Sequence, residues 1–231
     1  QLRHYTKRIM ATDDLADRKF DCDLVLNQNL GSQVEDYKKK VPNSCKLLLG
    51  CNYALLRPEF SKMRGRALKK RKSTKEIKNI LVSFGGSDID NITYDILQQI
   101  NDRFNVVVVL GGASPHNIMI KDYVKDKNIE VTISADNMVE LMLNADLAIG
   151  AGGSTSWERC CLGLPTLLYI LAENQREIAE NLEKLGAAIL VKDLKNDLQM
   201  LVSDFNLWQD MSSKAQNVCY GTGVKRVIQQ L

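Results

Sequence analysis

The sequence predicts an α/β protein built around a parallel β-sheet, and three observations lead to that class. After residue 78, short apolar runs alternate regularly with stretches of helical periodicity. The apolar runs are rich in Val, Ile and Leu and show little polar alternation, as is typical of strands covered on both faces. The connections are short, so consecutive strands are expected to be joined by right-handed crossovers. The 231 residues, 45% hydrophobic and 26% charged, have the composition of an ordinary globular protein.

The second part of the chain contains most of the expected elements. Its strands are expected at 79–84, 105–110, 129–133, 146–150, 166–170 and 187–191. Its helices are expected at about 91–103, 115–127, 137–144, 155–162, 174–185, 194–203 and 206–219. This stretch is long enough for one α/β domain with its own hydrophobic core.

The first part is less complete. Short strands are expected at 7–11, 23–26 and 47–50, and a helix at about 58–72. Two or three strands with little helix cannot bury a sheet on both faces. The chain also opens with Gln1-Leu2-Arg3-His4, which is neither a signal peptide nor an ordinary translation start. We therefore expect the C-terminal portion of a longer protein. Residues 1–60 would be the remnant of an N-terminal α/β domain, 61–78 a basic linker and helix, and 79–231 a C-terminal domain.

Charge is unevenly distributed along the chain. Residues 1–77 carry 18 Lys and Arg against 9 Asp and Glu, whereas the remainder carries 13 against 19. Much of the basic excess lies between 62 and 78, a kind of run that can attract nucleic acid or anionic lipid. Because no aromatic residues are interleaved in it and an acidic half follows, we expect a solvated linker face and no nucleic-acid partner. No apolar stretch approaches the ~20 residues that span a bilayer, so stable membrane insertion is not expected.

The cysteines favour a reducing compartment. The six of them are scattered, and none forms a C-x-x-C pair, so a zinc site or a redox motif is not expected. Cys160 and Cys161 are neighbours on an expected helix and would bridge only with strain. We expect free thiols and a cytoplasmic protein.

Small and polar residues follow the first five expected strands of the second part at one edge of the sheet. Ligands of open α/β sheets bind outside the carboxyl ends of the strands, so this concentration predicts a binding cleft. The loops concerned are 85–88, 111–112, 134–138, 152–155 and 172–175.

The stretch from residue 147 to 166 is the most informative of these. An apolar strand is followed by Gly152-Gly153 and then by a helix that begins near Thr155. Such a turn offers main-chain amides to an anion. Glu158, one helical turn further on, could reach a sugar hydroxyl, and phosphate beside ribose indicates a nucleotide. Two plainer alternatives stay open at this point: Thr155 and Glu158 also fit a capping box, and glycine-rich turns can serve packing alone.

The two common nucleotide motifs do not occur. The G-x-G-x-x-G pattern of dinucleotide enzymes requires a third glycine that the loop at 83–88 lacks. A Walker loop, G-x-x-x-x-G-K-[ST], is absent from the sequence.

Several strings resemble the PseG family, the UDP-sugar hydrolases of pseudaminic acid biosynthesis, whose fold is the GT-B fold of MurG-like glycosyltransferases. In the second part these are 82–88 (VSFGGSD), 150–159 (GAGGSTSWER), 163–165 (GLP) and 173–175 (ENQ). The more distinctive strings lie earlier, at 13–18 (DDLADR), 23–29 (DLVLNQN) and 53–60 (YALLRPEF). The resemblance implies a Rossmann-type, GT-B-like C-terminal domain that binds UDP, preceded by the remnant of a second α/β domain.

The resemblance also implies a role for individual residues. The diphosphate would lie between two loops, the ribose hydroxyls would bind Glu158, and the uracil would lie at Ala135 and Met138. The loop residues facing the diphosphate would be Gly85, Gly86, Ser87, Gly153, Ser154 and Thr155. Asn174 and Gln175 would address the sugar, and Tyr53, near the domain junction, is expected to touch the substrate.

The catalytic residue is not identified. The resemblance implies a histidine in a glycine-rich loop that would lie upstream of Gln1, acting without a metal or cofactor. His4 stands too close to the start for such a loop, and His116, at an expected helix start, is interpreted as a surface residue. A general base must lie within hydrogen-bond reach of the water that it activates, and none can be named here.

Three functions are compatible with these observations. The first is hydrolysis of a UDP-linked 2,4-diacetamido-2,4,6-trideoxy sugar to UDP and free sugar. The second is a UDP-sugar-dependent glycosyltransferase of the MurG-like type, for which the basic stretch would face a membrane. The third is a UDP-binding fragment without activity. In each case the partner is a small-molecule UDP-sugar, and a monomer is expected.

Overall fold

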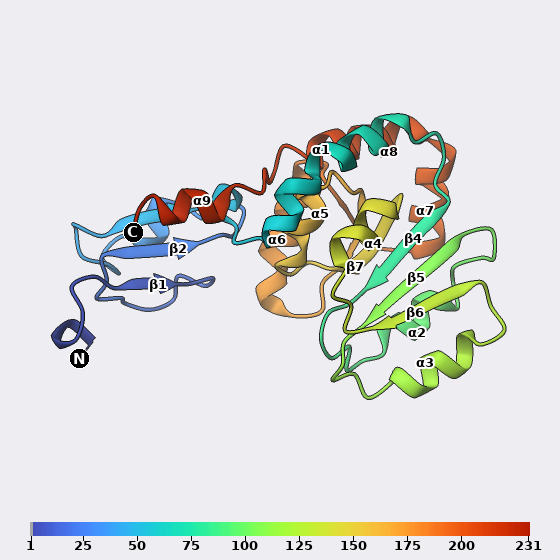
Figure 1. The fold of residues 1–231 in the computed structure, drawn as a ribbon, viewed down its shortest axis with the longest axis horizontal. Helices are drawn as coiled ribbons and strands as arrows, with labels where there is room; N and C mark the ends of the chain where they lie inside the picture. Colours follow the sequence, from blue (N-terminus) through green and yellow to red (C-terminus); the bar gives the residue numbers. More distant parts are fainter. Residues whose placement is uncertain (1) are drawn as a thin grey trace.

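The computed structural model describes residues 2–231 and contains two parallel sheets (Figure 1). The first sheet has the strand order β1-β2-β3, with β1 at Met10–Thr12, β2 at Leu24–Asn27 and β3 at Lys46–Leu49. In its register, Leu24 of β2 lies between Met10 and Lys46. All of β2 is buried, because it is the central strand and both of its faces are covered.

The second sheet has six parallel strands in the order β6-β5-β4-β7-β8-β9. The chain starts at the centre with β4, moves outward to β5 and β6, and then returns to continue on the other side with β7. This reversal places a topological switch point between β4 and β7, where ligands of α/β sheets bind. The strands are β4 (Asn79–Ser83), β5 (Asn105–Leu110), β6 (Ile129–Ile133), β7 (Leu147–Ala151), β8 (Thr166–Tyr169) and β9 (Ile189–Leu190).

Helices cover both faces of this sheet. The helices are α2 (Ile92–Leu97), α3 (Asn117–Val124), α4 (Met138–Asn144), α5 (Thr155–Cys161), α6 (Arg176–Lys184), α7 (Leu194–Ser203) and α8 (Phe205–Ala215). Successive residues of β4 enter different cores: Leu81 packs with α4, α5 and α6, whereas Ile80 and Val82 pack with α2, α3 and α7. The expected α/β class with a Rossmann-type parallel sheet is confirmed.

Helix α1 (Pro58–Ser73) lies against the second sheet's helices, with contacts to α4, α5 and α8. The expectation that its basic residues form a solvated face is wrong for Arg64, Lys70 and Arg71. Arg64 donates to the carbonyls of Cys161 and Gln216, and the buried Arg71 donates to those of Met142 and Ala145. These cations hold the helix on the domain because they satisfy carbonyls at the ends of neighbouring helices.

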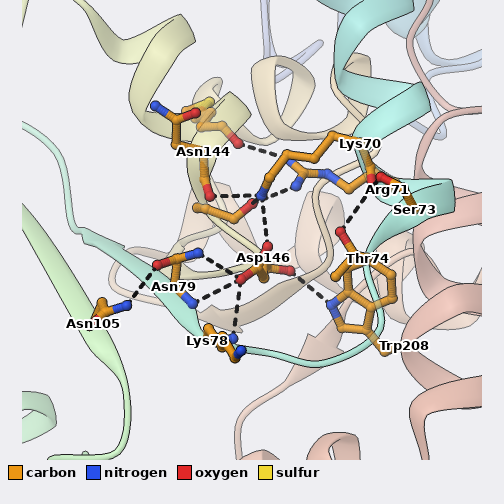
Figure 2. A network of polar contacts seen from close by, with 12 residues as sticks. Lys70, Arg71, Ser73, Thr74, Lys78, Asn79, Asn105, Asn144, Asp146 and Trp208 are labelled. Atoms are coloured by element: carbon orange, nitrogen blue, oxygen red, sulfur yellow. Dashed lines mark hydrogen bonds and ion pairs between the residues drawn. The ribbon is translucent and has the colours of Figure 1, made fainter.

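Asp146 joins α1 to the amino edge of the second sheet (Figure 2). Its side chain is 6% exposed and accepts from Lys70 Nζ at 2.7 Å. It also accepts from the main-chain N–H groups of Lys78 and Asn79, at 3.1 and 2.9 Å. Trp208 Nε1 donates to the Asp146 carbonyl at 2.8 Å. We call these five residues the Asp146 cluster, and it lies at the end of β4 and β7 opposite the polar loops.

A last helix, α9 (Gly223–Ile228), returns to the first sheet, where Figure 1 shows it beside β2. Val227 packs with Leu24, Leu26 and Leu48 of that sheet. Gly223 lies so close to the Ala54 carbonyl that a Cβ there would overlap it. The division into domains at residues 60 and 78 stays a prediction, and α9 lies on the far side of that division from the sheet that it covers.

Several elements differ in extent from their expected ranges. The helix expected at 91–103 is limited to α2, and the strand expected at 187–191 to β9. The start of α2 is set by Asp88, whose carboxylate accepts from the amides of Ile92 and Thr93 at 2.9 and 3.1 Å. None of the helices within residues 2–231 has the length and apolar character that crossing a membrane requires.

Candidate functional site

A cavity of about 420 Å³ opens at the switch point, between the loop after β4 and the turn after β7. The loop after β8 closes a third side, through Leu171, Ala172 and Gln175. Seven of the residues that the sequence singled out line this one cavity: Gly85, Gly86, Ser87, Gly153, Ser154, Thr155 and Gln175.

The glycines of the two loops serve different purposes. Gly85 has a φ of +86°, a conformation that side chains disfavour. The backbone of Gly86 contacts Gly111, and a Cβ on Gly111 would overlap the Gly86 carbonyl. The glycine after β5 therefore supports the first loop rather than facing a ligand. In the second turn Gly152 is packed beneath Gln175 and Ala179, whereas nothing lies within 4 Å of a Cβ built on Gly153.

The turn after β7 presents unused main-chain donors. The amides of Gly152 and Ser156 bond to the carbonyls of Tyr169 and Gly153. In the part of the chain that the structure describes, the amides of the three residues between them, Gly153, Ser154 and Thr155, have no protein acceptor. Polar groups of this kind require a partner, and here they border an open cavity.

Glu158 lies half-buried one turn into α5. The capping-box alternative is not observed: the N-cap residue is Ser154, and no side chain caps the helix start. Burial raises the pKa of the Glu158 carboxyl, while the charges of Arg57 and Arg159 act in the opposite direction. The Glu158 carboxylate therefore experiences the charge of nearby cations and forms no capping hydrogen bond at the start of α5.

Arg57, which the sequence pattern did not single out, has a charge that acts on the Glu158 carboxyl. It is the N-cap residue of α1, and its Nη1 donates to the Asp136 carbonyl at 3.4 Å. It thus connects the junction between the two sheets with the loop after β6, and its charge acts on the Glu158 carboxyl without a direct hydrogen bond or ion pair between the two described side chains. The available signal was its place in the string at 53–60, directly before the proline that starts a helix.

The other expected site residues lie on neighbouring surfaces. Ala135 and Met138 are half-buried at the start of α4 and pack against the core beneath α5. Asn174 lines a second cavity, of about 520 Å³, together with Asp14, Leu15 and Asn29 from the loops of the first sheet. Tyr53 is half-buried at the junction, in the 3-10 helix Cys51–Tyr53 that α9 contacts.

The remaining reactive side chains form no recognisable centre. Among residues 2–231 no three His, Cys, Asp or Glu side chains are grouped so that they could hold a metal ion. All six cysteines are free, and the sulfur atoms of Cys22 and Cys45 are 3.7 Å apart. His116 is the N-cap residue of α3, and its Nε2 lies 2.9 Å from the Ile89 carbonyl.

The family model "Glycosyltransferase family 28 C-terminal domain" matches residues 79–231, which contain the whole second sheet and the 420 Å³ cavity. The chain belongs to this family. It is therefore a glycosyltransferase-type domain of the kind that binds UDP-sugars.

Curated proteins also align with most of the chain. The chain is 38% identical over 163 residues to the uncharacterized protein MJ1062 of Methanocaldococcus jannaschii, an alignment of 67% of this chain and 34% of that protein. It is 26% identical to the UDP-2,4-diacetamido-2,4,6-trideoxy-beta-L-altropyranose hydrolase of Campylobacter jejuni, over 80% of this chain and 65% of the hydrolase. The chain thus spans about a third to two thirds of the length of these relatives.

The fold is shared with solved structures. The crystal structure of Acinetobacter baumannii MurG superposes with a TM-score of 0.64 over 99% of this chain and 67% of MurG, at 16% identity. The expected MurG-like GT-B fold is confirmed, whereas membership of the PseG family stays a prediction.

Proposed function

We propose that this chain is the nucleotide-binding part of an enzyme that hydrolyses a UDP-linked 2,4-diacetamido-2,4,6-trideoxy sugar to UDP and free sugar. One observation carries the proposal. Gly153, Ser154 and Thr155, whose amides have no protein acceptor among the described residues, line one cavity together with Gly85, Gly86 and Ser87, at the switch point of a family 28 domain. A cavity of about 420 Å³ is of the size that small-molecule sites occupy.

In this proposal the neighbouring residues would supply the rest of a UDP site. The diphosphate would accept hydrogen bonds from the second turn and lie against the first loop. The ribose hydroxyls would donate to Glu158, with Arg57 beside it. The uracil would extend along the loop after β6, toward Ala135 and Met138. The sugar would then point past Gln175 toward the cavity that Asn174 lines, on the side where Tyr53 and the first sheet lie.

In the proposed reaction a water oxygen attacks the anomeric carbon, the bond from that carbon to the diphosphate oxygen breaks, and UDP leaves. The chain's contribution is to hold the departing diphosphate, because amides aimed at developing negative charge lower the barrier to bond cleavage. The base that takes the proton from the water is not among the residues identified above. A histidine upstream of Gln1, as the family resemblance implies, is the expected candidate.

The test is an incubation of the native protein with UDP-2,4-diacetamido-2,4,6-trideoxy-altrose and no acceptor. We expect release of UDP and free sugar. No release under these conditions would reject hydrolysis. Residues 1–231 alone should still bind UDP, and failure to bind would reject the UDP site itself.

A glycosyltransferase is the second candidate, favoured by the family to which residues 79–231 belong. It would use the same UDP-sugar cavity and transfer the sugar to an acceptor hydroxyl instead of water. UDP release that depends on an added sugar or lipid acceptor would support it over the hydrolase. In either case we expect a monomer acting in the cytoplasm, and sizing by light scattering would test the oligomeric state.

A further inference from the structure

A buried guanidinium lies directly beneath the proposed diphosphate cavity. Arg159 is 3% exposed and reaches back from α5 toward the carboxyl end of β7. Its Nη2 donates to the Ala151 carbonyl at 2.6 Å and to Ser156 Oγ at 2.9 Å. Ala151 and Ser156 are the two ends of the turn whose inner amides have no protein acceptor. Arg159 therefore holds the turn at both ends.

The backbone around it leaves room for this cation. A Cβ on Gly150 would lie 2.8 Å from Arg159 Nη1 and would also overlap the Ser83 carbonyl. The guanidinium thus lies beside β7 where that strand approaches β4, below the points from which both loops of the cavity start. Ala151, whose carbonyl it binds, lines the cavity itself.

The charge of Arg159 has no acidic partner. Within residues 2–231 no carboxylate forms an ion pair with it, and Glu158, next to it in sequence, acts on it only at a distance. Burial lowers the pKa of the Arg159 guanidinium to about 10, so the group stays protonated at neutral pH. A buried charge is costly unless an opposite charge compensates it. Two neutral acceptors could equally be held by a neutral donor, so hydrogen bonding alone does not account for a cation here.

We infer that Arg159 is a positioning residue for the diphosphate, acting through the Ala151–Ser156 turn and through its uncompensated charge below the cavity. This inference rests on the proposed UDP site. Arg159 does not touch the nucleotide: it holds the turn so that its amides point into the cavity, and its field favours an anion there. Because the space between is buried, water screens this field less than it would at a surface.

Affinity for a ligand series separates a charge effect from a structural one. We would measure uridine, UMP and UDP binding to the native protein by calorimetry, with Arg159→Gln and Arg159→Lys as variants. Arg159→Gln should leave uridine affinity within twofold and weaken UDP binding by about tenfold or more, with UMP between them. Arg159→Lys keeps the charge and should recover part of the UDP affinity. Equal losses for all three ligands, or no loss for UDP, would overturn the inference.

A second measurement uses the unaltered protein, in case either variant fails to fold. Arg71 is as buried as Arg159 but lies in the Asp146 cluster's neighbourhood, at the other edge of the sheet, and serves as the matched control. In spectra of protein with ¹⁵N-labelled arginine, the Arg159 side-chain signal should shift on adding UDP but not uridine, and the Arg71 signal should not move. An unmoved Arg159 signal at saturating UDP would overturn the inference, whereas absence of UDP binding would instead reject the proposed site.

Discussion

Replacing Asp146 with alanine removes the acceptor at the centre of the Asp146 cluster. The change leaves the main-chain N–H groups of Lys78 and Asn79 and the half-buried ammonium of Lys70 without their partner. Each buried group left unpaired costs about 1–3 kcal/mol, and breaking a buried ion pair costs about 3–5 kcal/mol. Since Lys70 keeps its bonds to the Asn144 and Ala145 carbonyls, we expect a total loss of about 3–5 kcal/mol in the free energy of unfolding.

The assay is urea unfolding followed by circular dichroism, with thermal unfolding alongside. For a chain of this size the loss corresponds to a decrease of about 6–20 °C in Tm. Asp146→Asn retains one acceptor oxygen and should lose about 1–3 kcal/mol. Asp126→Asn, an exposed carboxylate after α3, is the matched control and should change stability by about 0.5 kcal/mol or less. A loss below about 1 kcal/mol for Asp146→Ala would refute this reasoning.

Two further predictions concern the proposed UDP site. Glu158→Gln should weaken UDP binding by about 1.5–3 kcal/mol, while 2′,3′-dideoxy-UDP binding changes little. Because burial raises the pKa of Glu158, stability falls as pH rises from the unfolded-state pKa through the folded-state pKa, and at neutral pH the ionised carboxylate opposes folding, so Tm of the unliganded variant should increase. Exposed Glu130→Gln is the control, and equal losses for UDP and the dideoxy analogue would argue against a ribose contact. Gly153→Ala should weaken UDP binding in calorimetry with little change in Tm, since the added Cβ meets no protein atom; unchanged binding would place the diphosphate elsewhere.

Much of the second sheet could be predicted because its strands are continuous apolar runs. Residues 105–110 and 129–133 match β5 and β6, since Val and Ile in short segments between polar turns have few alternatives. The polar loops were equally predictable, because glycine and serine after a strand mark the carboxyl edge of a parallel sheet. The structure therefore brings all six expected diphosphate residues to one cavity.

What could not be predicted depends on contacts between distant parts of the chain. Helix α9 is short, and Val227 becomes a core residue only because β2 and β3 lie beneath it. Lys70 and Arg71 are indistinguishable in sequence from the exposed Lys69 and Lys72, and only the docking of α1 separates them. The effect of the Arg57 charge on Glu158 could not be predicted either, because the two residues are brought together only by the junction between the two sheets. Composition and periodicity carry no information of this kind.

The return of α9 has a consequence for how the polypeptide matures on the ribosome. The strands of the first sheet emerge long before Gly223–Ile228. Leu24 and Leu48 therefore lack their contact with Val227 until the entire second sheet has been synthesised. During that interval an apolar face is open to chaperones and to other nascent chains. Truncation before Gly223 would make this transient exposure permanent, and aggregation during translation is the phenotype to look for.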